Sequence, residues 1–147
     1  MFDKILCAVD GSEHALKAAR VASELAARHD GKLTLLTVTK PLKVTDEVKH
    51  YIEVEHLAGE SQYVLDQYTE EVIQNAKDAA RAEGVGEVTS EIKTGQPART
   101  ILQLAERGGY DTIVLGSRGL GDLEGFLLGS VAHKVASLAK CTVITVK

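Results

Sequence analysis

Residues 4–39 carry two apolar runs separated by a helical pattern, and read KILCAVDGSEHALKAARVASELAARHDGKLTLLTVT. The run Ile5–Val9 is continuously apolar, as expected of a strand buried on both faces of a sheet. Ser12 suits the N-cap of a helix that reaches Gly31. Its helical stripe of small residues, which suits close packing on a sheet, is Ala15, Ala19, Ala22 and Ala26, flanked by Leu16 and Leu25. Lys32–Thr39 is rich in β-branched residues, so the stretch predicts a β-α-β unit.

The middle of the chain continues the alternation. Residues 40–60 are the least regular stretch, and residues 61–83 then show the periodicity of a long amphipathic helix. Its periodic positions are Leu65, Tyr68, Val72, Ala76 and Ala79. Gly84 is suited to end this helix as its C′ residue. Residues 88–93 alternate in polarity and predict a third strand that lies nearer an edge of the sheet.

The last third of the chain predicts two more helix–strand pairs. Pro97 fits the first turn of a helix whose buried side would use Ile101, Leu102 and Ala105. Residues 112–115 form a fourth apolar run that ends at Gly116, a helix begins near Ser130, and residues 142–146 predict a fifth strand. We therefore expect one α/β domain over residues 1–147, built on a single open, doubly wound, five-stranded parallel sheet with helices on both faces.

Composition excludes several classes of protein. The chain has 147 residues, 44% hydrophobic and 26% charged, with a net charge of −4, which is typical of a globular domain. The mild acidity and the 4% aromatic content argue against nucleic-acid binding. We expect no membrane span and no signal peptide. Two cysteines without metal-ligand spacing indicate neither a disulfide framework nor a metal cluster, and favour a cytoplasmic protein.

A glycine-rich loop follows the fourth predicted strand. Residues 116–130 read GSRGLGDLEGFLLGS, and the last two residues open a helix. Exposed amides in such a loop, together with a helix N-terminus, suit a bound phosphate. The loop lacks the lysine of GxxxxGK[ST], and Glu124 stands where GxGxxG needs its third glycine. The loop is therefore neither a P-loop nor a dinucleotide fingerprint.

The spacing G-x₂-G-x₉-G-S, formed by Gly116, Gly119, Gly129 and Ser130, resembles the nucleotide-binding signature of the universal stress protein family. The opening KILCAVDGSEHALKAA and the closing CTVITVK also resemble the first strand and helix and the final strand of that family. The resemblance covers essentially the whole chain. It implies the strand order 3-2-1-4-5, with a crevice between strands 1 and 4 where α/β proteins bind ligands.

The resemblance also implies a binding site for ATP, with or without Mg²⁺. Ala8, Val9 and Asp10 match the end of the first strand, where the aspartate would lie near the ribose, and Val38 matches a residue that packs on adenine. Leu115, Gly116, Arg118 and Gly119 match the stretch that runs along the ribose and phosphates. Gly129, Ser130 and Val131 match the helix start that holds the phosphates. Plain structural roles stay open for core residues such as Val38 and for Asp10 as a turn residue.

The leading interpretation is an ATP-binding universal stress protein that acts as a cytoplasmic sensor or adaptor with unknown protein partners. Slow ATP hydrolysis is an alternative, although no catalytic residue is identified. A second alternative is a stress protein that binds no nucleotide and acts through protein contacts. Asp122 and Glu124 place negative charge inside the glycine loop, which lowers the expected affinity for a triphosphate unless a bound Mg²⁺ reverses the effect.

Other reactive residues show no site pattern. The five histidines are scattered and lack an apparent Ser or Cys partner, and Cys7 lies in a core strand. Cys141 precedes the last strand and is the better candidate for redox sensing, while Tyr51, Tyr63 and Tyr68 are interpreted as packing residues. The uncharged, β-branched run Thr142–Val146 would lie at a sheet edge. Together with the resemblance, this run predicts a homodimer joined through the last strand.

Overall fold

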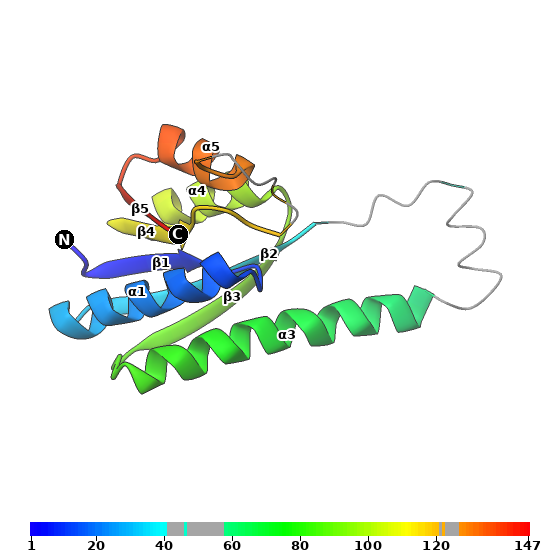
Figure 1. Cartoon of the computed structure of the whole chain (residues 1–147), viewed down its shortest axis with the longest axis horizontal. Helices are drawn as coiled ribbons and strands as arrows, with labels where there is room; N and C mark the ends of the chain where they lie inside the picture. The colour runs from blue at the N-terminus through cyan, green and yellow to red at the C-terminus, as the bar shows by residue number, and fades with distance from the viewer. Residues whose placement is uncertain (41–45, 47–57, 121, 123–126) are drawn as a thin grey trace.

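The computed structural model describes residues 1–40, 46, 58–120, 122 and 127–147, so the irregular stretch and most of the glycine loop's centre, including Glu124, lie outside the described residues. The elements alternate as expected (Figure 1). In chain order they are β1 (Lys4–Ala8), α1 (Glu13–His29), β2 (Lys32–Thr39), α3 (Ala58–Ala82), β3 (Val88–Thr94), α4 (Pro97–Gly108), β4 (Thr112–Gly116), α5 (Ser130–Leu138) and β5 (Thr142–Val146).

The strands form one five-stranded parallel sheet in the order β3-β2-β1-β4-β5, which confirms the predicted fold. Helices α1 and α3 cover one face, and α4 and α5 cover the other (Figure 1). The chain leaves β1 through α1 on one face and leaves β4 through α5 on the opposite face. The boundary between β1 and β4 is therefore the switch point of the sheet.

The ends of α1 show one confirmed and one wrong expectation. The Ser12 hydroxyl accepts a hydrogen bond from the Ala15 N–H at 3.2 Å, as the N-cap prediction requires. The helix ends earlier than expected, because Asp30 (φ +53°) supplies the left-handed C-cap residue. Gly31 is needed for a different reason: a Cβ atom there would overlap the carbonyl oxygen of Phe2.

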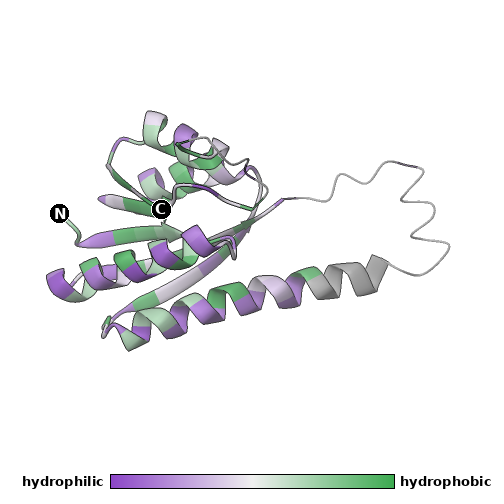
Figure 2. Cartoon of the chain, viewed as in Figure 1, coloured by the Kyte–Doolittle hydropathy of each residue, from purple (hydrophilic) through white to green (hydrophobic). Residues whose placement is uncertain are grey.

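Helix α3 begins at Ala58, earlier than the periodicity predicted, and ends at Ala82, with Gly84 (φ +82°) in the left-handed conformation just beyond it as expected. The Val85 N–H donates to the Ala80 carbonyl at 3.3 Å across this end. Apolar and polar residues alternate along the helix (Figure 2). Leu65 and Tyr68, expected on its buried side, are instead 42% and 46% exposed, because they extend past the sheet face that covers the later turns of α3.

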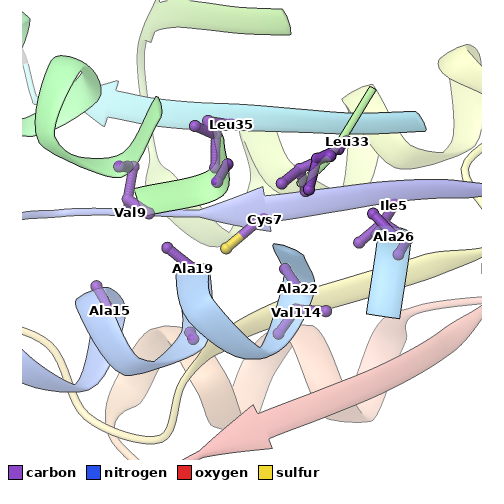
Figure 3. Packing of buried hydrophobic residues seen from close by; sticks show 14 of the residues in the cluster. Ile5, Cys7, Val9, Ala15, Ala19, Ala22, Ala26, Leu33, Leu35 and Val114 are labelled. Carbon is purple, nitrogen blue, oxygen red and sulfur yellow. The ribbon is translucent and has the colours of Figure 1, made fainter. Parts of the chain in front are cut away.

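The core lies on both faces of the sheet. The alanine stripe of α1 is fully covered, as predicted, and faces Cys7 and the side chains of β1 and β2 (Figure 3). Leu16 does not share in this contact and is 39% exposed. On the other face, Ile101 and Ala105 of α4 are buried, and Leu102 packs against them half-buried. Strand β3 has no fully buried residue, in keeping with its predicted place near an edge.

Candidate functional site

A cavity of about 750 Å³ opens at the carboxyl ends of β1, β2 and β4, beside the switch point of the sheet. This volume lies in the range of small-molecule sites. Main-chain and side-chain atoms from both faces of the sheet meet there, because α1 and α5 leave β1 and β4 in opposite directions. The place is the one at which open α/β sheets bind ligands.

All but one of the predicted site residues line this cavity. The lining includes Ala8, Val9, Asp10, Val38, Leu115, Gly116, Arg118, Gly119, Ser130 and Val131. Gly129 is buried and is absent from the lining, although it directly precedes α5 as its N-cap residue. The residues that the family resemblance selected from four separate segments are thus neighbours in space.

Asp10 joins the two loops of the switch point. Its Oδ1 atom accepts the Ser12 N–H at 2.9 Å, and its Oδ2 atom accepts the Leu120 N–H at 3.1 Å. The carboxylate is half-buried and lies on the cavity wall. Each carboxylate oxygen has a second acceptor site, so Asp10 can bind a donor on a ligand while it holds both loops.

The glycines of the loop after β4 serve different purposes. A Cβ atom at Gly116 would lie 2.8 Å from His14 Cβ and 2.9 Å from the Ala15 nitrogen. Gly116 therefore permits close approach of α1 to β4, a packing role that the sequence interpretation had not assigned to it. At Gly119 a Cβ atom would lie 2.7 Å from Asp10 Oδ2 and 3.5 Å from Asp122 Oδ2, so two carboxylates converge on this residue.

Asp122 contacts the N-terminal end of α5. The Gly119 N–H donates a hydrogen bond to Asp122 Oδ2, and the Asp122 N–H donates to the Gly119 carbonyl at 3.4 Å. A Cβ atom at Gly129 would overlap Asp122 Oδ2 and lie 2.7 Å from Asp122 Cγ. The side chain thus occupies the space immediately in front of Gly129.

Ser117 connects the loop to the last strand. Its carbonyl accepts the Gly129 N–H at 2.6 Å, and its own N–H donates to the Val146 carbonyl at 2.6 Å. The Ser117 hydroxyl lies 3.0 Å from His14 Nδ1. His14 therefore has a serine partner that was not apparent from the sequence, because the two residues lie 103 positions apart.

Several residues that line the cavity were not predicted as site residues from the sequence. They come from the ends of α3 and β3 that face the cavity: Leu65, Tyr68, Thr69, Ile92 and Thr94. Tyr68 was interpreted as a packing residue, yet it is 46% exposed, and its hydroxyl lies over Gly11 (φ +87°) in the turn after β1. Neither the periodicity of α3 nor the alternation of β3 distinguishes these residues from others on the same elements, so no local pattern in the sequence indicates their position beside the cavity.

The charged lining is more acidic than basic. The basic residues of the lining include Lys40 and Arg118, and the acidic residues include Asp10, Asp66, Glu70 and Asp122. Within the described residues, no three His, Cys, Asp or Glu side chains gather closely enough to hold a metal ion. Over the same residues, no helix is long and apolar enough to cross a membrane.

The cysteines lie outside the cavity lining. Burial raises the pKa of the Cys7 thiol to about 12, so this side chain is a neutral part of the core. Burial also raises the pKa of Cys141, which is half-buried beside β5. Because the thiolate is the reactive form, both environments disfavour redox chemistry.

Comparisons with known proteins agree with this arrangement. The profile of the Universal stress protein family matches residues 1–147. Universal stress protein YxiE of Bacillus subtilis (strain 168) is 36% identical over 149 residues, with 100% of each chain covered. The solved structure of hypothetical protein MJ0577 is 28% identical, with a TM-score of 0.80 over 100% of this chain and 96% of the other.

A third comparison concerns a protein with a bound ligand. A universal stress protein solved in complex with cAMP is 26% identical to this chain. The TM-score is 0.71, and the match covers 97% of this chain and 94% of the other. A protein of closely similar fold therefore binds an adenine nucleotide.

Proposed function

The chain belongs to the universal stress protein family, and from this premise we propose that its cavity binds an adenine nucleotide, with ATP as the ligand. One observation carries the proposal: residues from the ends of β1, β2 and β4 and the start of α5 line one cavity at the switch point. Its volume of about 750 Å³ admits a ligand of nucleotide size. The similar protein that is solved with cAMP supports the same ligand class.

The side chains around the cavity suit the parts of a nucleotide. Val38 and Leu115 supply apolar surface for a base, and the Asp10 carboxylate supplies an acceptor for ribose hydroxyls. Ser130 supplies a hydroxyl at the N-terminus of α5, where a phosphate is favoured, and Gly119 has an amide nearby that donates to Asp122 in the structure. When Mg²⁺ accompanies ATP, it neutralises part of the phosphate charge next to the acidic lining.

Binding is tested first on protein purified without added nucleotide. After denaturation, chromatography should detect a released adenine nucleotide, and calorimetry should give an affinity for ATP. Gly129→Val should abolish ATP binding, because its side chain would fill the space in front of α5 that Asp122 now occupies. Gly86→Val is the matched control, since a Cβ atom there meets nothing within 4 Å. Unchanged ATP affinity in folded Gly129→Val would exclude this site.

We propose that ATP serves as a signal in a cytoplasmic stress-response sensor or adaptor and that its turnover is slow. Both oxygens of the Asp10 carboxylate already accept backbone N–H groups, which suits a binding role better than that of a general base. Steady-state hydrolysis by the purified protein should stay well below the ~1–10³ s⁻¹ of typical enzymes. A rate above about 1 s⁻¹ would assign the protein to the ATPases instead.

We also propose a homodimer joined through β5, which is one of the two edge strands of the sheet. The Thr142 N–H donates to the Asp111 carbonyl at 3.2 Å, and the Val146 carbonyl accepts the Ser117 N–H at 2.6 Å. These even-numbered positions therefore point toward β4. Because strand residues alternate, the N–H groups of Val143 and Thr145 point to the outer edge, where a second copy can pair with them.

This alternation supplies a matched pair of variants. Val143→Pro removes an outward N–H and should weaken the dimer while leaving the β4–β5 ladder in place. Ile144→Pro removes an inward N–H and should destabilise the fold itself. Light scattering coupled to size exclusion gives the mass: about twice 15.8 kDa is expected at micromolar concentration, and a mass of 15.8 kDa would reject the dimer.

A further inference from the structure

The carboxylate of Asp122 lies where the loop and α5 offer their groups to an anion. We infer that Asp122 is a specificity-determining residue that competes with the phosphates of a bound nucleotide, and so disfavours ligands with long phosphate chains. The inference rests on the proposed function, because it concerns the same cavity. It assigns to this side chain the choice between ligands of the adenine class.

The first step is the contact with Gly119. The Gly119 N–H is directed at Asp122 Oδ2 and forms a hydrogen bond with it. An amide in a glycine-rich turn is the type of donor that a phosphate oxygen uses. In this structure the donor is already bound to a negatively charged oxygen of the protein itself. A ligand phosphate that uses this amide must first displace Asp122.

The second step is the position in front of α5. Gly129 is the N-cap residue of α5 and has no side-chain cap, so it leaves the helix start open to an external acceptor. A Cβ atom at Gly129 would overlap Asp122 Oδ2 and lie 3.2 Å from Asp122 Oδ1. Both oxygens of the carboxylate thus lie against this helix start, where the helix dipole favours negative charge. Glycine at 129 is the residue that makes room for them.

The third step concerns charge. Asp10 Oδ2 also approaches Gly119, so a phosphate entering here would face two carboxylates while Asp122 stays in place. Moving Asp122 away removes one of them and frees the Gly119 N–H. Under the proposed function the phosphates of ATP meet the Gly119 amide and the start of α5, so ATP bears the cost of this exchange, whereas adenosine has no phosphate and does not bear it. Asp122 therefore acts on the phosphates and leaves recognition of the nucleoside unchanged.

The test compares wild type with Asp122→Asn, which keeps the size of the side chain and removes its charge. Affinities for ATP, AMP and adenosine are measured by calorimetry in EDTA, with Asp78→Asn on the exposed face of α3 as the matched control. We expect Asp122→Asn to raise ATP affinity about tenfold, the scale of one hydrogen bond to a charged group, with adenosine affinity unchanged. Unchanged or lower ATP affinity, or an equal rise for adenosine, would overturn the inference.

Two further measurements separate this inference from the proposed function. The ATP titration is repeated with Mg²⁺: a loss of affinity in Asp122→Asn under this condition alone would make Asp122 a metal ligand and overturn the inference. Inorganic pyrophosphate is the second probe. If no adenine compound binds wild type or Asp122→Asn, the proposed function fails. The pyrophosphate titration then tests the competition by Asp122 on its own. Stronger pyrophosphate binding by Asp122→Asn and by Asp122→Ala would still support a competing carboxylate, and equal binding would overturn it.

Discussion

Two ends of the sheet use an aspartate to collect backbone N–H groups, and they use it differently. At the amino end, Asp111 accepts the N–H groups of Phe2, Asp3 and Lys4 at 3.0, 2.9 and 2.9 Å. Its Oδ1 atom also accepts the Thr112 hydroxyl at 2.6 Å. These bonds tie the start of the chain, where Phe2 has a φ of +65°, to the start of β4.

At the carboxyl end, Asp10 and Asp122 also accept N–H groups from nearby loops, but they line a cavity. The comparison separates two roles of an aspartate that accepts backbone N–H groups. Where the aspartate's partners all belong to the chain and link its segments, it stabilises the fold. Where the same bonds border an open cavity, a ligand can share or replace them. We expect variants at the amino end to change stability and variants at the carboxyl end to change binding.

The largest effect is expected where the two roles coincide. Gly116→Val should destabilise the protein by about 1–3 kcal/mol or prevent folding, because its side chain would meet the backbone of α1 at His14 and Ala15. Chemical denaturation measures the change, with Gly86→Val as the control of equal size. If Gly116→Val has normal stability but no longer binds ATP, Gly116 acts only in binding, like the residues expected to do so at the carboxyl end of the sheet.

Asp111→Asn should lower the free energy of unfolding by about 1–2 kcal/mol, since it weakens several partly exposed hydrogen bonds to a charged group. ATP affinity should stay at the wild-type value. Denaturation and calorimetry on the same preparation give both numbers. A large loss of ATP affinity in this variant would contradict the proposal that the amino end of the sheet serves stability and the carboxyl end serves binding.

The same aspartate predicts a pH dependence. Partial burial raises the pKa of Asp111, but the hydrogen bonds from Thr112, Lys4, Asp3 and Phe2 outweigh it and hold that pKa below 3.8. The ionised form is therefore favoured by folding. Its contribution is complete above pH 3.8 and is lost as the pH falls below that value. The stability difference between wild type and Asp111→Asn should shrink over that range, and a constant difference would contradict this account.

Asp10→Ala should lower adenosine affinity about tenfold, the scale of a hydrogen bond to a charged group. Adenosine is the sharper probe because it lacks phosphates, so the lost negative charge does not compensate. Calorimetry in EDTA measures the change. Retained adenosine affinity would restrict Asp10 to joining the turn after β1 to the loop after β4.

The smallest effect is expected for Ser130→Ala. The hydroxyl is one neutral group on an exposed helix start, so its loss should cost about 0.5–1.5 kcal/mol of ATP binding for a neutral hydrogen bond, and more where the bond is to a charged phosphate oxygen. Adenosine binding and the unfolding midpoint should not change. A lower unfolding midpoint in this variant would mean that Ser130 contributes to the fold of the helix start as well.

Much of the fold and part of the site follow from local patterns. The N-cap at Ser12, the C′ residue at Gly84 and the alanine stripe of α1 were predicted because each depends on a few neighbouring residues. The end of α1 was misplaced, since either Asp30 or Gly31 could adopt the left-handed conformation and Gly31 is needed for contact with Phe2. Tyr68 was assigned to the core because helical periodicity does not show where the sheet beneath a helix ends.

The sequence by itself determined the order of strands and helices, and its resemblance to a family indicated the sheet order and the loops that carry the site. These properties reside in short-range periodicity, in turn residues and in the spacing of glycines. Only the tertiary structure decided that Asp10 reaches the amide of Leu120, that Gly116 faces α1, and that Asp122 lies in front of Gly129. Such contacts depend on how the elements pack across the sheet. Asp10 and Leu120 lie 110 positions apart, so no local sequence pattern indicates that they are in contact.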